Sequence, residues 1–284
     1  MKPEKIAIHN QVAEALSEDL GGGKDLTANL IDSNQQSKAQ LFVKEDAVLC
    51  GVDWFNETFL QINTNVQIVW SKKDGDTLTK GDKICDLSGQ SRALLTGERT
   101  AINFLQTLSS VATQTYQIQN IIALAGKKTR VLDTRKTIPN LRVAQKYAVT
   151  CGGGSNHRIG LYDQLLIKEN HIAACGGISK SIEKARLLYG QEVFIEIEVE
   201  NIDELREALK MDVDQVLLDN FDISMVTDAV KLKTTLDANS ILEVSGNITE
   251  RNILSYARAG IDYISLGSLT KNIKAVDFSL LIDA

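Results

Sequence analysis

The spacing of hydrophobic and polar residues changes twice in the first half of the chain. Residues 4–20 have helical spacing and end at three glycines, 21–23. From about 38 to 90, the short apolar runs AQLFVK, VQIVWS and DKICDL are separated by turns that contain glycine, which is typical of strands. Residues 93–125 return to helical spacing with few helix-breaking residues. This order predicts a small β-rich domain followed by a long connecting helix.

Beyond residue 130, short apolar stretches alternate with helical ones. We expect strands at 130–133, 165–168, 193–199, 215–219, 241–244 and 262–266. Repeated strand–helix units predict parallel strands joined by crossover helices, and their regular recurrence is typical of a β/α barrel. Too few residues remain for eight full units, so we expect an irregular, incomplete barrel. A doubly wound open sheet is the structural alternative.

Charge is unevenly distributed along the 284 residues, whose formal net charge is −6. The window 127–168 holds nine Lys or Arg residues and only two Asp or Glu residues. A basic segment within an acidic chain indicates a locally bound anion, whereas a nucleic-acid-binding protein is more often basic overall. Part of the window has a simpler interpretation, because Arg142 and Lys146, spaced i, i+4, fit a solvated helix face.

The sequence gives no sign of a membrane segment. No apolar run approaches the roughly 18 residues that span a bilayer, and the N-terminus lacks a signal-peptide core. We therefore expect a cytoplasmic protein without membrane or nucleic-acid partners. The four cysteines, at positions 50, 85, 151 and 175, contain no C-x-x-C pair, so reduced structural thiols are expected rather than a zinc site or disulfides. Cys151 directly precedes three glycines, and a reactive role is its alternative.

Polar residues follow the predicted parallel strands at their carboxyl ends, where β/α proteins bind ligands. These residues are Asp133, Thr134, Arg135, Lys136, Lys168, Asn170, His171, Glu196, Glu198, Glu200, Asp219, Asn220, Ser245, Gly246, Asn247, Gly267 and Ser268. Cations and carboxylates on one rim suit a polyanion together with magnesium, which binds carboxylates and substrate phosphates. Glu198 and Asp219 are candidate magnesium ligands, directly or through water. A solvent-facing edge strand is the alternative for 196–200.

Three glycine-containing stretches have a candidate role in binding. Residues 245–247 and 267–268 follow the last two strands, where barrels often bind phosphate through backbone N–H groups. Residues 152–154 either let the backbone approach a ligand closely or form a flexible turn. Arg158 can bind a carboxylate through two parallel hydrogen bonds. His157 is a neutral donor, a cation or a core residue, and the sequence leaves these alternatives open.

Several motifs together resemble one enzyme family. DTRKTIPNLR (133–142), KYAVTCGGGSNHRIGLYDQLLIKENHI (146–172), EIEVE (196–200), LLDN (217–220), EVSGNI (243–248) and SLGSLTK (265–271) are similar to quinolinate phosphoribosyltransferases, and EDLGGGKDLT (18–27) and TGERTAINFLQ (96–106) extend the match. The resemblance implies an N-terminal α/β sandwich domain, placed at 1–112 with the connector helix, and an irregular α/β barrel at 113–284. The extreme C-terminus would pack on the N-terminal domain.

The resemblance also implies a reaction and its residues. The family converts quinolinate and phosphoribosyl pyrophosphate to nicotinate mononucleotide, CO₂ and pyrophosphate with Mg²⁺. Quinolinate would be bound by Arg135, His157, Arg158 and Lys168, and by Arg99 from the neighbouring subunit of a homodimer. The 5′-phosphate would be bound by Ser245, Gly246, Asn247, Gly267 and Ser268. Lys136, Glu198 and Asp219 would handle phosphoribosyl pyrophosphate and its magnesium, and together with Lys168 form the expected catalytic set. On pattern alone, Arg99 is a solvated helix charge.

One position departs from the family pattern, and three other functions remain as alternatives. Where the family usually has glycine after the proline of the turn, Pro139 is followed by Asn140; asparagine tolerates left-handed backbone, so we expect the turn to persist. The nearest alternative is a related transferase of molybdenum-linked gene clusters, against which the intact LIKENH argues. The others are a barrel lyase or aldolase with Lys168 as a Schiff base, and a non-catalytic phosphosugar-binding protein.

Overall fold

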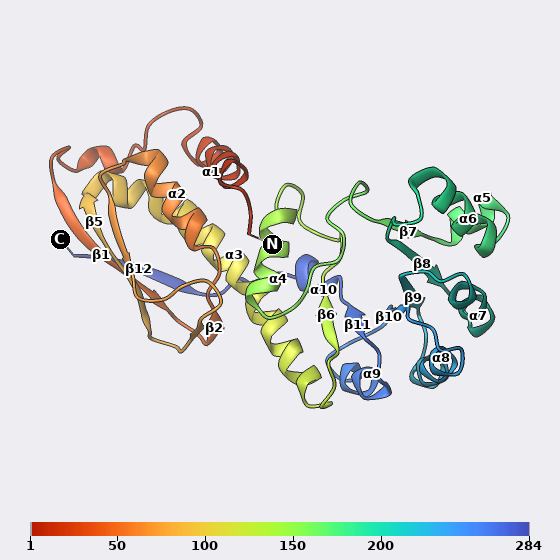
Figure 1. Ribbon diagram of the computed structural model, residues 1–284. Coiled ribbons are helices and arrows are strands. Elements are labelled where there is room, and N and C mark those ends of the chain that lie inside the picture. Colours follow the sequence, from red (N-terminus) through yellow and green to blue (C-terminus); the bar gives the residue numbers. More distant parts are fainter. Residues whose placement is uncertain (1, 284) are drawn as a thin grey trace. The chain divides into compact units, whose positions relative to one another are not determined.

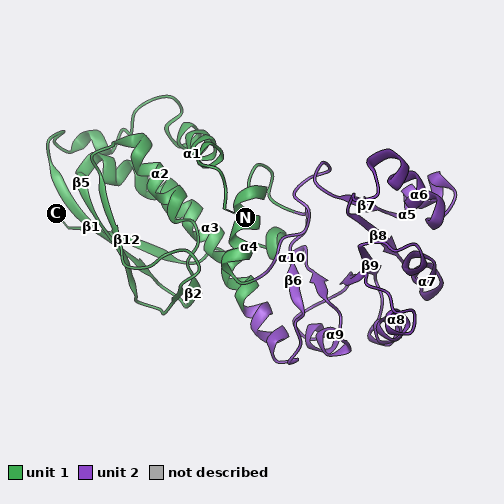
Figure 2. Cartoon of the chain, in the orientation of Figure 1, with its two compact units in different colours: residues 1–116, 137–153, 269–284 green, residues 117–136, 154–268 purple. Residues whose placement is uncertain are grey.

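The computed structural model describes residues 2–283 (Figure 1). The chain forms two compact units, which Figure 2 colours separately. The first comprises residues 1–116, 137–153 and 269–284, and the second comprises 117–136 and 154–268. The units thus interleave along the chain, whereas the sequence prediction placed a single boundary at residue 112 and expected only the extreme C-terminus to pack on the N-terminal domain.

The first unit is built on a four-stranded antiparallel sheet. Its strand order is β12 (Phe278–Asp283), β1 (Gln36–Val43), β5 (Lys83–Gln90) and β3 (Gln67–Trp70). Exposed and buried residues alternate in the first half of β1, as expected for a strand with one face on a core. The short strands β2 (Ala47–Val48) and β4 (Thr77–Leu78) form a separate antiparallel pair. The last strand of the chain therefore completes the N-terminal sheet.

The first unit also contains helices, two of which, α2 (Val52–Ile62) and the 33-residue α3 (Ser91–Ala123), share one hydrophobic core with this sheet. The others are α1 (Lys5–Leu20), the 3₁₀ turn η1 (Ala28–Leu30) and α4 (Arg142–Cys151). Phe55 and Phe59 of α2 pack with Leu41 of β1 and with Leu94 and Leu105 of α3, all fully or almost fully buried. This helix-and-sheet arrangement confirms the predicted α/β sandwich. Among residues 2–283, no helix combines the length and the apolar character needed to cross a bilayer.

The second unit is a six-stranded parallel sheet. Its order is β6 (Arg130–Leu132), β11 (Tyr263–Ser265), β10 (Ile241–Ser245), β9 (Gln215–Asp219), β8 (Ile195–Val199) and β7 (Leu165–Ile167). Between and after the strands lie α5 (Glu169–Cys175), α6 (Ile178–Tyr189), α7 (Ile202–Lys210), α8 (Ile223–Thr235) and α9 (Ile253–Ala259). The short helix α10 (Ser268–Lys271) begins at the last residue of this unit and otherwise belongs to the first. All six predicted strands are confirmed.

The strand order decides between the two predicted architectures. From β7 to β11, each strand lies beside the one that follows it in the chain, and β6 joins after β11. This winding in a single direction is that of a barrel, whereas a doubly wound sheet reverses direction at a switch point. Because β6 and β7 are the two ends of the sheet, the predicted incomplete barrel is confirmed.

Two of the alternatives considered for helix and strand faces do not hold. The i, i+4 pair Arg142 and Lys146 was compatible with a solvated helix face, but Lys146 is only 3% exposed. The solvent-facing edge strand considered for 196–200 does not occur, because β8 lies between β7 and β9 and Glu196 is fully buried. The turn after Pro139 persists as expected, with Asn140 in left-handed conformation at φ 63°.

Candidate active site

The carboxyl ends of the parallel strands carry the charged residues that the sequence singled out. Lys168 follows β7, Glu198 lies near the end of β8, and Asp219 is the last residue of β9. Parallel pairing brings these ends to one edge of the sheet. The second unit therefore assembles the predicted rim from residues that are far apart in the sequence.

Lys168 and Glu198 form an ion pair across neighbouring strands. The Lys168 Nζ donates to Glu198 Oε2, and the register that pairs Ile167 with Ile197 makes the two residues neighbours. Burial raises the pKa of Glu198, while the lysine opposes this shift and the charge of Asp219 adds to it. Glu198 and Asp219 thus lie close together, and Lys168 neutralises only part of their negative charge. A further cation would be favoured between them.

Glu198 and Asp219 fit the donor set of magnesium. Both supply hard carboxylate oxygens from adjacent strand ends, and Mg²⁺ in proteins typically uses one or two carboxylates together with substrate phosphates and water. Asp219 is oriented by its neighbours: Ser245 Oγ donates to its Oδ1 at 3.1 Å, and Asn220 Nδ2 donates to its Oδ2 at 2.7 Å. These two residues would hold the ion.

The loops after β9 and β10 interlock at a glycine. Gly246 has φ 88°, a conformation that residues with a side chain rarely adopt. A Cβ at this position would lie 2.1 Å from Asn220 Oδ1. Asn247 Nδ2 donates to the same oxygen at 3.2 Å, and Asn220 and Asn247 are both left-handed, at φ 55° and 53°. The predicted phosphate-binding residues 245–247 therefore form a tight, specifically shaped loop.

Lys136 and Gly267 also lie together, although they come from different ends of the second unit. A Cβ on Gly267 would be 2.9 Å from Lys136 Cδ. The backbone N–H of Lys136 donates to Thr134 Oγ1 at 3.0 Å, which shapes the loop after β6. Ser268 begins the single-turn helix α10. The structure thus places a cation beside the second predicted phosphate loop.

The Asp133 carboxylate fixes the segment that carries Asn156 and His157. It accepts hydrogen bonds from the Asn156 side chain and from the His157 backbone N–H, the latter at 3.0 Å. Ser155 N–H donates to Val131 O at 2.9 Å, so this segment pairs with β6 along its edge. The residues that follow the glycines 152–154 are consequently well ordered by hydrogen bonds.

His157 points into a buried acidic network. Its Nε2 lies 3.0 Å from Glu196 Oε2 and 3.8 Å from Glu243 Oε2, and its Nδ1 accepts the Arg158 backbone N–H at 2.7 Å. An accepting Nδ1 leaves Nε2 as the nitrogen that donates, to Glu196. Of the alternatives that the sequence left open, the structure favours a core-facing histidine.

Glu243 completes this network and was missed by sequence reasoning. It is fully buried and receives hydrogen bonds from Gln215 and Ser265. Burial, and then the neighbouring Glu196, raise the pKa of Glu243 to about 8. The signal was present, because Glu243 interrupts the apolar run ILEV, but attention to strand ends overlooked a residue in the middle of a strand.

Arg158 lies near enough to Arg135 for the two positive charges to interact, and near enough to Glu196 and Asp163 for these carboxylates to offset part of the repulsion. Burial lowers the pKa of Arg158, and the nearby charge of Arg135 lowers it further. The Arg158 Nη1 donates to Gln164 O at 3.2 Å, which anchors one end of its guanidinium. Two like charges in a partly buried place favour a bound anion.

Arg99 lies in the first unit and is exposed on α3. Its exposure agrees both with a solvated helix charge and with the role in a neighbouring subunit that the resemblance implies. That role stays a prediction.

Comparison with known proteins gives consistent matches over almost the whole chain. The family descriptions "Quinolinate phosphoribosyl transferase, N-terminal domain" and "Quinolinate phosphoribosyl transferase, C-terminal domain" match residues 25–109 and 111–281. A "Probable nicotinate-nucleotide pyrophosphorylase [carboxylating]" of Bacillus subtilis (strain 168) is 42% identical over 263 residues, covering 93% of this chain and 89% of that protein. A mitochondrial "Quinolinate phosphoribosyltransferase [decarboxylating] 2b" of Nicotiana tabacum is 35% identical over 288 residues, covering 95% and 80%.

Solved structures agree with these matches. The nicotinate-nucleotide pyrophosphorylase from Francisella tularensis superimposes with a TM-score of 0.94 at 44% identity, covering 99% of this chain and 98% of that chain. NadC from Streptococcus pyogenes also gives a TM-score of 0.94, at 38% identity, covering 100% and 99%. On these grounds the chain belongs to the quinolinate phosphoribosyltransferase family.

Proposed function

We propose that this protein transfers the phosphoribosyl group of phosphoribosyl pyrophosphate to quinolinate with loss of CO₂, which yields nicotinate mononucleotide and pyrophosphate for NAD biosynthesis. The relatives named above for this reaction support the proposal. The observation that carries it in this chain is the set of cations in the second unit: Arg158 lies near enough to Arg135 for their charges to interact, and Lys168 pairs with Glu198 at adjacent strand ends. Quinolinate is a dianion, and such a set of donors suits two carboxylates.

The first step breaks the bond between the anomeric carbon of the ribose and the pyrophosphate. Positive charge develops on the ribose ring, as in glycoside cleavage. The carboxylates of Glu198 and Asp219 stabilise this charge, and Lys136 stabilises the departing pyrophosphate. Mg²⁺, held by Glu198 and Asp219, would neutralise charge on the pyrophosphate when bound.

The second step needs no nucleophile from the protein, because the quinolinate ring nitrogen attacks the anomeric carbon itself. The ring nitrogen then carries a positive charge, which stabilises the electron pair left on the adjacent ring carbon when CO₂ leaves, and a proton from water takes the place of the lost carboxylate on that carbon. The protein holds the dianion in position for both events. We assign this holding to Arg135, Arg158 and Lys168. His157, whose two ring nitrogens are engaged within the protein, positions Arg158.

The loops after β10 and β11 bind the 5′-phosphate in this proposal. Ser245, Gly246 and Asn247 form the first loop, and Gly267 and Ser268 form the second. The absence of a side chain at Gly246 and the neighbouring Lys136 at Gly267 support the assignment, since phosphates are commonly bound by backbone N–H groups near a lysine.

We further propose a cytoplasmic homodimer in which Arg99 of one subunit completes the quinolinate site of the other. Its exposure on α3 supports this role. The free state of the four cysteines suits a reducing compartment. Measurement of the molar mass in solution tests the dimer and shows whether it assembles further.

The direct experiment supplies the purified protein with phosphoribosyl pyrophosphate and Mg²⁺, and adds quinolinate to one sample and nicotinate to another. Pyrophosphate release with quinolinate alone, matched by an equal amount of CO₂, is the expected result. Release with nicotinate alone would move the function to a salvage reaction. No release in either sample, with folded protein, would favour the molybdenum-linked relative or a binding role. The Lys168 Nζ is paired with the Glu198 carboxylate, whereas a Schiff-base lyase needs this nitrogen as its nucleophile.

A further inference from the structure

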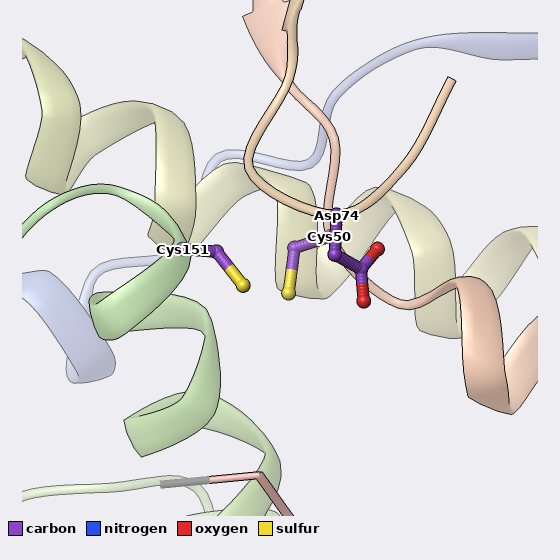
Figure 3. A group of neighbouring side chains, drawn as sticks. All are labelled: Cys50, Asp74 and Cys151. Atoms are coloured by element: carbon purple, nitrogen blue, oxygen red, sulfur yellow. The ribbon is translucent and has the colours of Figure 1, made fainter.

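Two cysteines and an aspartate that the proposed reaction does not use lie together in the first unit (Figure 3). Cys50 lies between β2 and α2, Asp74 lies in the turn between β3 and β4, and Cys151 is the last residue of α4. One ligand atom from each, the two sulfurs and a carboxylate oxygen, all lie within 4.8 Å of one another. Three separate segments of the chain therefore bring potential metal ligands to one point.

The two thiols lie side by side and differ in exposure. Their sulfurs lie within 4.8 Å of each other, and Cys50 is fully buried whereas Cys151 is half-buried. The thiolate is the form in which cysteine binds metals, so each thiol would lose its proton when the ion binds.

Asp74 is oriented by three hydrogen bonds. Its Oδ1 accepts the backbone N–H groups of Gly51 and Val52 at 3.0 and 3.1 Å, and its Oδ2 accepts Tyr147 Oη at 2.9 Å. A carboxylate offers about four lone-pair positions, so one position remains for a further partner. Metal-binding carboxylates are commonly held by such outer hydrogen bonds.

The cluster lies in a largely buried place beside a second carboxylate. Asp53 lies close enough for its charge to act on Asp74, although Asp53 is itself paired with Lys2 at 2.9 Å. A bound divalent cation would stabilise the ionised thiols and carboxylate together.

We propose that Cys50, Asp74 and Cys151 bind a thiophilic divalent metal ion, for which Zn²⁺ is the best match. Two sulfurs and one carboxylate oxygen suit zinc, with water in the fourth tetrahedral position. Mg²⁺ and Ca²⁺ prefer oxygen ligands alone, so this site is chemically distinct from that of Glu198 and Asp219. Tetrahedral zinc places such ligand atoms roughly 3.5–3.8 Å apart, which small side-chain movements achieve from separations of at most 4.8 Å.

The bound ion would stabilise the first unit by linking its segments. It ties the end of α4 to the loop before α2 and to the turn before β4. An ion that binds the native state and not the unfolded chain raises the unfolding temperature by mass action. Binding also releases the thiol protons, so the affinity should increase with pH.

The first experiment titrates the reduced, metal-free full-length protein with Co²⁺, whose complexes with thiolates absorb strongly. The expected result is thiolate-to-cobalt charge-transfer absorption that saturates at one Co²⁺ per chain, apart from any cobalt held by Glu198 and Asp219, and that Zn²⁺ then abolishes by displacement. In Cys151→Ser the affinity should fall by more than about tenfold, because even the loss of an outer-shell partner costs 10–100-fold. Cys50→Ala and Asp74→Asn should weaken binding as well.

Cys175→Ser is a matched control. Cys175 is also the last residue of its helix, is half-buried and is followed by two glycines, like Cys151. This variant should bind Co²⁺ as the parent protein does. Zn²⁺ should raise the unfolding temperature of the parent and of Cys175→Ser, and leave that of Cys151→Ser unchanged.

Three outcomes would overturn the proposal. They are a titration of the folded, reduced protein without charge-transfer absorption, a signal of equal strength in Cys151→Ser, and purification of the protein with Cys50 and Cys151 joined as a disulfide that excludes the metal. Circular dichroism of each metal-free variant establishes that it is folded, and Cys50→Ala replaces Cys151→Ser if the latter is not. None of these readouts involves quinolinate, so they are independent of the proposed reaction.

Discussion

The Nε2 atom of His157 lies 3.0 Å from Glu196 Oε2, in a network where Glu196 is fully buried. The next residue along the chain is Arg158, whose backbone N–H binds the other nitrogen of the same ring. The histidine is therefore held at both nitrogens, and its position fixes the start of the arginine. Buried Glu196 thus positions His157, and His157 in turn positions the backbone of Arg158.

Glu243 should make stability depend on pH. Its pKa is about 8 in the folded protein and about 4.3 in an unfolded chain, so the folded state keeps a proton that the unfolded state loses. Stability should then fall as the pH rises from about 4.3 to about 8 and level off above that value. In Glu243→Gln, which imitates the protonated acid, thermal unfolding between pH 5 and 8 should show a flatter dependence. An unchanged slope would mean that Glu243 is ionised at neutral pH.

Arg158→Ala should impair the use of quinolinate far more than the binding of phosphoribosyl pyrophosphate. Loss of two charge-assisted hydrogen bonds predicts a fall of roughly 100-fold or more in kcat/KM for quinolinate. The affinity for phosphoribosyl pyrophosphate, measured by calorimetry, should stay within about threefold. Arg251→Ala is a control, because Arg251 is exposed on the same unit. Equal losses for both substrates would count against the assigned role.

Much of the second unit could be predicted because its strands are short apolar runs. The segment QVLLD becomes β9, and its terminal Asp219 reaches the rim as expected. In the first unit, β12 adds an edge strand to the N-terminal sheet by pairing with β1, where Leu280 lies opposite Leu41. Local spacing carries no information about such a pairing between distant segments.

In the candidate site, too, the sequence indicated residues at strand ends but not most contacts between segments that are far apart in the chain. Lys168 and Glu198 were both predicted from strand ends, and they meet because their strands pair in parallel. The meeting of Cys50 with Cys151 was not predicted, because cysteine spacing indicates a metal site only when the cysteines lie close together in the sequence. Burial of Lys146 was also missed, because i, i+4 spacing identifies a helix face without showing what covers it.

Removal of divalent cations should abolish pyrophosphate release, and Mg²⁺ should restore it. In Glu198→Gln and Asp219→Asn, the Mg²⁺ concentration for half-maximal activity should rise by about tenfold or more, because each variant removes a charged oxygen ligand. Glu200→Gln is the matched control, since Glu200 follows the same strand but is exposed. A parallel rise in Glu200→Gln would indicate a general effect of charge on the rim.

Arg99 can be tested by mixing two inactive variants. If Arg99 serves the neighbouring subunit, a heterodimer of Arg99→Ala and Arg158→Ala contains one site with both arginines and one site with neither. Random exchange of subunits should then restore about a quarter of the sites. Activity is measured before and after exchange, with each variant alone as the control. No recovery, when exchange is shown by mass labelling, would place Arg99 outside the neighbour's site.

Gly246→Ala should affect both stability and phosphate binding. The positive φ costs an alanine about 1 kcal/mol, and its Cβ would also meet the Asn220 side chain at 2.1 Å. Gly81→Ala separates these effects, because Gly81 has φ 94° with no atom within 4 Å of the added Cβ. Both variants should unfold at a lower temperature, whereas only Gly246→Ala should raise the KM for phosphoribosyl pyrophosphate. The added Cβ would also displace Asn220 from Asp219, so the Mg²⁺ concentration that Gly246→Ala needs for half-maximal activity should rise as well. An unchanged KM for phosphoribosyl pyrophosphate in Gly246→Ala would show that this loop does not bind the 5′-phosphate.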